Sequence, residues 1–233
     1  MTAVLKRELG AYFHSAIGFT FLAVFYLCSG MFFYFMTYSR VANMSVIFSN
    51  MFTIIMLIIP ILTMKLMSDD KRLKTDQALL TAPVRLSSLV IGKYLSALIV
   101  YVLALAINVV YMLVLGAFTE MDWMSFWGNL LGMFLLGAAV IAIGLFISSL
   151  TNSQAVAAIG TLAASMLIIL MDSLASAVSW GWLTTFIGWI SFNSRYEPFT
   201  SGILNYSNVF FFISVVAIFL FLTMRVLDKK RWS

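Results

Sequence analysis

The sequence predicts an all-α, polytopic membrane protein. Of its 233 residues, 63% are hydrophobic and only 10% are charged, and the mean hydropathy is +1.03. A soluble domain of this size carries about 25% charged residues and has too small an interior to bury so much apolar surface. Lipid is therefore the expected solvent for most side chains, which excludes soluble enzymes and nucleic-acid-binding proteins.

Long stretches without Asp, Glu, Lys or Arg define the expected spans. About 20 helical residues cross the hydrocarbon layer once. The stretch from Trp123 to Met171 is too long for one crossing, and the polar run 148–154 within it predicts a turn between two helices. We expect one membrane domain over residues 1–233, with six transmembrane helices at residues 17–38, 43–66, 87–118, 126–150, 154–172 and 206–226.

The distribution of basic residues predicts that both termini are cytoplasmic. With six spans, twelve of the 14 Lys and Arg residues fall on the side of the termini, and only Arg40 and Arg195 fall on the other side. Cytoplasmic connections of membrane proteins carry such an excess of positive charge. The net charge of +5 therefore indicates orientation in the cell membrane and not a nucleic-acid partner.

Two further segments are expected to lie at the membrane surfaces. Residues 1–14 place their apolar side chains on one helical stripe, which predicts an interfacial helix. Residues 173–204 are rich in Trp and Ser and are expected to form short outer or re-entrant helices. Trp182, Phe186 and Trp189 share one helical face there and could close the outer end of a pathway as a gate; interfacial anchoring is the alternative.

Several kinds of chemistry are not expected within the chain. The single cysteine and single histidine, Cys28 and His14, allow neither an internal disulfide nor a bis-histidine metal or haem site. Gly92-Lys93 is followed by Tyr94 and does not form a phosphate-binding P-loop, so this chain is not expected to hydrolyse ATP and any energy for its work must come from elsewhere. No ionisable side chain is expected inside a span, which disfavours an ion-coupled carrier.

Two groups of side chains within the spans allow alternative interpretations. Met and Phe residues of the second span could line a path for amphiphilic substrates, although lipid-facing residues are the commoner explanation. They are Phe48, Met51, Phe52 and Met56. Gly128 and Gly132, with later glycines of the fourth span, allow close helix approach, and packing within the chain is favoured over a dimer interface.

The segment between the second and third spans, residues 69–84, carries the most informative pattern. Asp69 and Asp70 can occupy the first turn of a helix, where the positive end of the helix dipole favours acids. Pro83 then marks the exit. A short cytoplasmic amphipathic helix here could dock on a soluble partner as a coupling helix. The alternative, which composition alone favours, is a solvated helix whose basic face binds anionic lipid.

The order of side chains along this segment resembles the coupling region of type-2 ABC permeases. The shared order is an acidic pair, basic residues, Thr, an acid, two leucines, Pro-Val and a Gly-Lys that opens the third span. Here it reads Asp69-Asp70, Lys71-Arg72, Thr75, Asp76, Leu79-Leu80, Pro83-Val84 and Gly92-Lys93, and Lys74 replaces the family's usual Gly. The sequence from Phe192 to Trp232 is similar to the gliding-motility-type branch of the family.

The resemblance implies a non-catalytic permease subunit of an ABC exporter that works by alternating access. Separate cytoplasmic ATPase subunits would bind ATP and Mg, a second permease subunit, identical or homologous, would complete a dimer, and an auxiliary membrane protein could join. The residues implied at the ATPase contact are Asp69, Asp70, Arg72, Thr75, Asp76, Leu79, Leu80 and Pro83. The alternative is a membrane scaffold or channel-like component that recruits a non-ATPase partner through the same helix.

Overall fold

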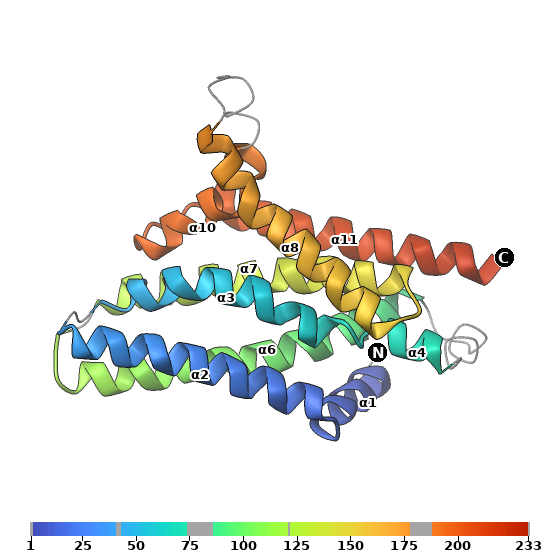
Figure 1. The fold of residues 1–233 in the computed structure, drawn as a ribbon, viewed down its shortest axis with the longest axis horizontal. Coiled ribbons are helices and arrows are strands. Elements are labelled where there is room, and N and C mark those ends of the chain that lie inside the picture. Colours follow the sequence, from blue (N-terminus) through green and yellow to red (C-terminus); the bar gives the residue numbers. More distant parts are fainter. Residues whose placement is uncertain (1, 41–42, 74–85, 121, 178–187, 233) are drawn as a thin grey trace.

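The computed structural model describes residues 2–40, 43–73, 86–120, 122–177 and 188–232, and these ranges are helical with short connections (Figure 1). Within these described ranges, six helices are long and apolar enough to cross a membrane, which confirms the predicted all-α class and agrees with the expected number of spans. The helices are α1 (Thr2–Phe13), α2 (Ala16–Tyr38), α3 (Ser45–Thr63), α4 (Ser68–Arg72), α6 (Leu86–Gly116), α7 (Trp123–Leu150), α8 (Gln154–Ala177), α10 (Phe192–Thr200) and α11 (Tyr206–Trp232).

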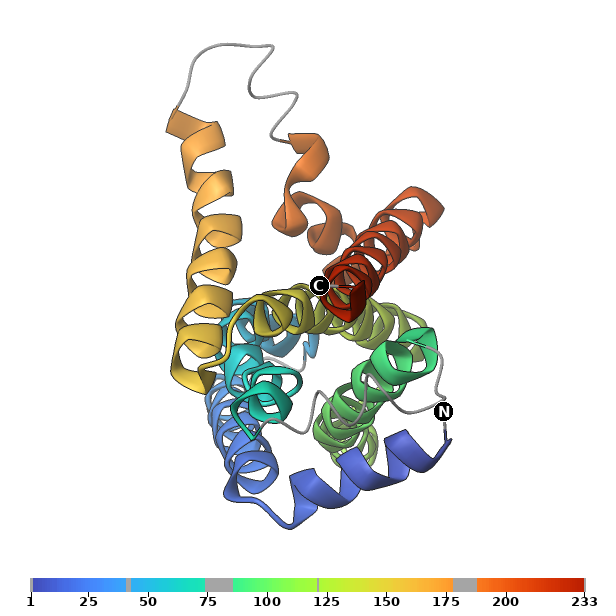
Figure 2. The same ribbon diagram turned by 90° about the vertical axis from the view of Figure 1, so that its right-hand side faces the viewer.

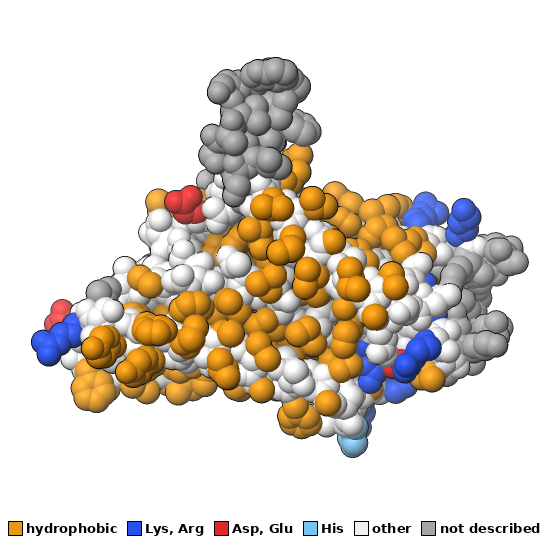
Figure 3. Space-filling model, in the orientation of Figure 1, with side chains coloured by type: hydrophobic (Ala, Val, Ile, Leu, Met, Phe, Trp, Pro, Cys, Tyr) orange, Lys and Arg blue, Asp and Glu red, His pale blue; other side chains and the backbone are white. Residues whose placement is uncertain are grey.

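The two ends of the helix bundle differ in what they carry. One end, called the base, holds α1, α4, the α7–α8 connection and both chain termini, on the right-hand side of Figure 1. The opposite end, called the far end, holds the α2–α3 and α6–α7 connections and α10. Hydrophobic side chains cover the surface between the two ends, and charged side chains gather at the ends (Figure 3). This distribution suits a helix bundle whose middle lies in hydrocarbon.

Helix α7 is the central element of the bundle. It packs against α3, α6, α8, α10 and α11. Most of its residues between Phe126 and Ser149 are buried. It ends at Leu150, and α8 begins at Gln154 after a short turn, as the polar run in the sequence predicted.

Glycines let neighbouring side chains reach the backbone of α7. A Cβ added at Gly132 would lie 2.6 Å from the Cβ of Phe199, and one added at Gly137 would collide with the Tyr101 ring. A Cβ at Gly144 would collide with Thr63. The glycines of this helix therefore serve packing within the chain, which confirms the interpretation favoured from the sequence.

Helices α8 and α11 lie at the periphery. Figure 2 shows α8 rising away from the other long helices. Large apolar side chains remain exposed on both helices, including Ile159 and Leu167 of α8 and Phe210 and Ile218 of α11. Because these side chains are apolar and lie on span-length helices, lipid or another membrane helix is the expected neighbour.

The Met and Phe side chains of the second span lie in the core. Phe48, Met51 and Met56 are fully buried, and Phe52 is only 6% exposed. This position contradicts the lipid-facing interpretation, because α3 directs them toward α7 and other helices. The role of these four side chains as a pathway lining stays a prediction, because it requires the helices to be arranged differently.

Candidate functional site

The base is organised around Lys93, a lysine of α6 whose side chain is only 2% exposed. Its ammonium lies 2.6 Å from Oδ2 of Asp70 and 3.1 Å from Oε1 of Glu8, and it donates to the Leu66 carbonyl at 2.6 Å. The ammonium donates hydrogen bonds to Glu8 and to Leu66 and forms an ion pair with Asp70, so its charge is compensated inside the protein. A buried lysine is stable only when it is paired in this way. Lys93 therefore joins α6 to α1, to α4 and to the residues that follow α3.

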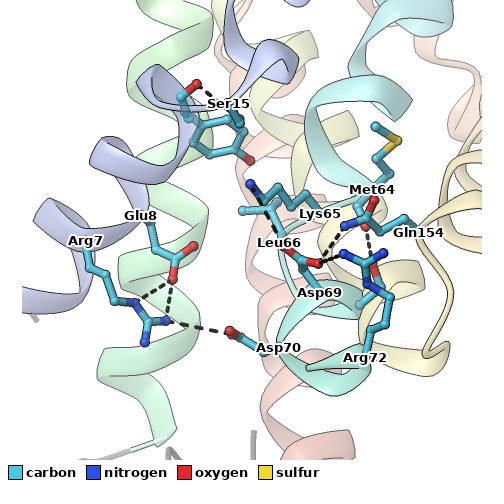
Figure 4. Close-up of polar contacts among 12 residues, drawn as sticks. Arg7, Glu8, Ser15, Met64, Lys65, Leu66, Asp69, Asp70, Arg72 and Gln154 are labelled. Atoms are coloured by element: carbon cyan, nitrogen blue, oxygen red, sulfur yellow. Dashed lines mark hydrogen bonds and ion pairs between the residues drawn. The ribbon is translucent and has the colours of Figure 1, made fainter. Parts of the chain in front are cut away.

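Arg7 supplies a second cation to the same carboxylates. Its Nη2 atom lies 2.5 Å from Oε1 of Glu8 and 3.8 Å from Oδ2 of Asp70 (Figure 4). Burial opposes the charge of Arg7, but the hydrogen bond and charge of Glu8, together with Asp70, raise the pKa of its guanidinium. Two cations and two carboxylates balance one another in this group of Arg7, Glu8, Asp70 and Lys93, which we call the Lys93 cluster.

Asp69 lies beside the Lys93 cluster but connects different helices. Its Oδ1 atom accepts a hydrogen bond from Nη2 of Arg72 at 3.0 Å and from Nε2 of Gln154 at 2.7 Å (Figure 4). Lys65 Nζ lies 3.9 Å from the other carboxylate oxygen. Since Gln154 is the first residue of α8, Asp69 links α4 to the start of the fifth span.

Two serines at the end of α7 bind the connection between α3 and α4, Ser148 through its side chain and Ser149 through its backbone. The backbone N–H groups of Met67 and Ser68 both donate to Oγ of Ser148, at 3.0 and 3.1 Å. Lys71 of α4 donates to the Ser149 carbonyl. The start of α4 would otherwise expose N–H groups that no helical carbonyl satisfies, so Ser148 replaces a conventional helix cap.

Helix α1 is fastened to α3 by a tyrosine. Tyr12 is buried, and its hydroxyl donates to the Leu62 carbonyl at 2.8 Å. Burial, with the negative charge of Glu8 nearby, raises the pKa of Tyr12, so the hydroxyl stays protonated as a donor. Helix α1 is thus docked onto the bundle by Tyr12 at one end and Glu8 near its middle.

These contacts surround both ends of residues 74–85, which lie outside the described residues between α4 and α6.

A comparison with protein families matches residues 26–232 to the model of the ABC-2 family transporter protein. The chain belongs to this family. A search of curated proteins finds no match. As an ABC-2 family member, the chain is a membrane permease subunit of an ABC transporter. Asp70 and Lys93 fall within the matched range, whereas Glu8 precedes it.

The structure describes three of the residues implied at the ATPase contact of this ABC-2 permease. Asp69 and Asp70 lie in α4 with their carboxylates engaged by other side chains of the chain. The Arg72 side chain is 59% exposed, although it also bonds Asp69. The other implied contact residues lie outside the described residues, and their role stays a prediction: Thr75, Asp76, Leu79, Leu80 and Pro83.

Sequence reasoning missed Glu8 and Lys93. The expectation that no ionisable residue lies inside a span was wrong for Lys93, which falls within the third span as assigned from the sequence and is buried by protein. Its two carboxylate partners come from α1 and α4, so no local pattern pairs them. The available signals were a lysine within the assigned third span and an acid, Glu8, in a basic N-terminal segment.

The proposed outer gate is described only in part. Trp182 and Phe186 lie outside the described residues, so their role stays a prediction. Trp189 is 67% exposed in the described part of the chain, and its role in the gate also stays a prediction. Among the described residues of this segment, the buried aromatic side chains are Phe192, Tyr196 and Phe199 of α10. Tyr196 and Phe199 contact α3 and α7.

Proposed function

We propose that this permease subunit works in an ABC exporter of the cell membrane, driven by separate ATPase subunits that carry ATP and Mg. A second permease subunit, identical or homologous, would complete the dimer, and alternating access would move the substrate. The C-terminal pattern from Phe192 to Trp232 supports the gliding-motility-type branch.

The observation that carries this proposal is the ion pair between Asp70 and Lys93. These residues belong to the two helices that flank residues 74–85, and their charged atoms are 2.6 Å apart. A force applied to either flank is therefore passed to α1, α4 and α6 together. An ATPase that bound residues 74–85 would move these elements as one unit, which is what coupling of hydrolysis to helix movement requires.

The ATPase contact is tested by replacing Leu80 with aspartate. An apolar anchor at the centre of an interface contributes about 2 kcal/mol or more, whereas a single rim charge such as Asp76 contributes little. Leu80→Asp should abolish co-purification of the ATPase and substrate-stimulated hydrolysis, and Asp76→Asn should weaken both only slightly.

The matched control is Leu150→Asp, which makes the same change at an exposed leucine of the base. It should leave the ATPase bound. Wild-type co-purification and hydrolysis with Leu80→Asp would contradict the proposed coupling role. Capture of a stable partner without ATPase activity would favour the scaffold alternative.

The orientation of the chain is tested by cysteine labelling. In a Cys28→Ala background, Ser233→Cys should react only with reagents on the cytoplasmic side, because the basic residues place both termini there. Ser179→Cys should react only from outside. Labelling of both positions from the same face would contradict the proposed topology.

A further inference from the structure

Helix α8 is attached to the rest of the bundle by a narrow face. Among residues 154–171, the buried side chains are those of Ala157, Thr161 and Ser165, which are small and follow one stripe at four-residue spacing. In that part of α8, 17% of the residues are buried, compared with 72% for the membrane-spanning part of α7. Small side chains form few contacts with a neighbouring helix, so α8 can tilt against α3 and α7 more easily than α7 can move.

The start of α8 is tied to α4 by a hydrogen bond. Nε2 of Gln154 donates to Oδ1 of Asp69 at 2.7 Å (Figure 4). The acceptor is a carboxylate, so the bond is charge-assisted and stronger than a neutral one. Arg72 and Lys65 form ion pairs with the same carboxylate and hold it in place. Because α4 leads into residues 74–85, a displacement of that segment is expected to reach Gln154 through Asp69.

A close contact between α7 and α8 provides a pivot. A Cβ added at Gly160 would lie 2.9 Å from Cγ2 of Ile147, so the Ile147 side chain of α7 lies against the backbone of α8. With a rise of about 1.5 Å per residue, this contact lies about 9 Å along the helix from Gln154 and about 15 Å from Leu170 on its other side. A displacement of Gln154 is therefore amplified about 1.7-fold at Leu170.

We propose that Gln154 is a positioning residue for transport, which transmits movement of α4 to α8 and tilts α8 about its contact with Ile147. The inference rests on the proposed function, because an ATPase must move residues 74–85 to displace α4. Since α4 is also bonded to Ser148 and Ser149 of the well-buried α7, it turns about these bonds, and α8 is the helix that yields. Shifts of about 1–2 Å are typical where packed helices switch, which gives about 2–3 Å at Leu170.

The test measures the distance between α8 and α7 in the complex of the full chain with its ATPase, in lipid nanodiscs. Spin labels are attached to Leu131→Cys of α7 and Leu170→Cys of α8, two exposed positions, in a Cys28→Ala background. The labelled chain is diluted with unlabelled chain, so that the measured pairs lie within one chain. Double electron–electron resonance should show a shift of about 2–3 Å between the nucleotide-free complex and the complex trapped with ATP and vanadate.

Two substitutions of Gln154 separate its hydrogen bond from the bulk of its side chain. Gln154→Leu removes the donor and should abolish most of the shift, while the ATPase stays bound through residues 74–85. Gln154→Lys supplies a charged donor to Asp69 and should keep the shift. Asn152→Leu, at an exposed position of the same α7–α8 connection, is the matched control and should also keep it.

The outcomes separate this inference from the proposed function. A wild-type chain that binds no ATPase would overturn the proposed function and this inference with it. With the ATPase bound, this inference alone would be overturned by a wild-type chain without a shift or by an undiminished shift in Gln154→Leu. Loss of the shift in Gln154→Lys or in Asn152→Leu would overturn it as well, because the effect would then not belong to the hydrogen bond.

Discussion

The base and the far end of this permease are held together by different forces. At the base, a fully buried lysine and two carboxylates connect α1, α4 and α6. At the far end, aromatic side chains do the equivalent work: the Tyr196 hydroxyl donates to the Phe48 carbonyl at 2.9 Å, and Phe199 packs onto Gly132.

The difference has consequences for how each end responds to change. A buried ion pair is stable only while all its members are present, so the base should fail as a unit. Truncation of a packed aromatic side chain destabilises the fold in proportion to the volume removed, and it leaves no unpaired charge. The base therefore suits the transfer of a displacement between helices, whereas the far end suits a fixed packing of α10 against α3 and α7.

The largest effect is expected from Lys93→Met. This change leaves the carboxylates of Glu8 and Asp70 with only the half-exposed Arg7 as a cation, and removing one partner of a buried pair costs about 3–5 kcal/mol. Thermal unfolding of the purified permease in detergent should show a large loss of stability together with loosening of α1.

The control is the neutral triple variant Glu8→Gln, Asp70→Asn and Lys93→Met. Because the one charge that it leaves unpaired, that of Arg7, belongs to a half-exposed side chain, it should recover much of the lost stability. It should still impair coupling, since the link between the flanks of residues 74–85 is gone. If Lys93→Met were as stable as the wild type, the base would not depend on its charges.

A smaller effect is expected at the far end from Phe199→Ala. The Phe199 side chain is fully buried against α7, and truncation of a buried Phe costs about 3 kcal/mol. Phe210→Ala, on the exposed face of α11, is the matched control and should change unfolding much less. Equal losses in the two variants would mean that α10 is not part of the packed core.

The spans could be predicted from the sequence because lipid imposes a simple condition on it. A span must be apolar and long enough to cross the hydrocarbon layer. Each long apolar helix of the described structure contains a stretch of sequence without charged residues that meets this condition. The turn between α7 and α8 was equally local, since the polar residues that form it are contiguous.

The site could be predicted only where its signal was local. The acidic pair Asp69-Asp70 stands out in the sequence, but its partners Lys93 and Gln154 are distant along the chain, and only the fold brings them together. Trp189 was assigned to a packed face from helical periodicity alone, which cannot reveal whether another helix lies opposite. The packing of Phe199 onto Gly132 is likewise not visible to periodicity, because the two residues lie on different helices.

The smallest effect is expected from loss of the uncharged hydrogen bonds that Ser148 forms at the base. Ser148→Ala removes the acceptor shared by the N–H groups of Met67 and Ser68, and leaving buried donors unsatisfied costs about 1–3 kcal/mol. Hydrogen exchange should accelerate at these two amides and along α4, while the amides of α10 at the far end keep their protection.

The matched control for this prediction is the neighbouring residue. Ser149 is as fully buried as Ser148, but its hydroxyl donates only to the Phe146 carbonyl within α7. The bond from Lys71 goes to the Ser149 backbone and survives loss of the side chain. Ser149→Ala should therefore leave exchange in α4 unchanged. Equal acceleration in both variants would mean that α4 responds to the stability of α7 as a whole, and that the charges of the Lys93 cluster hold α4 without help from Ser148.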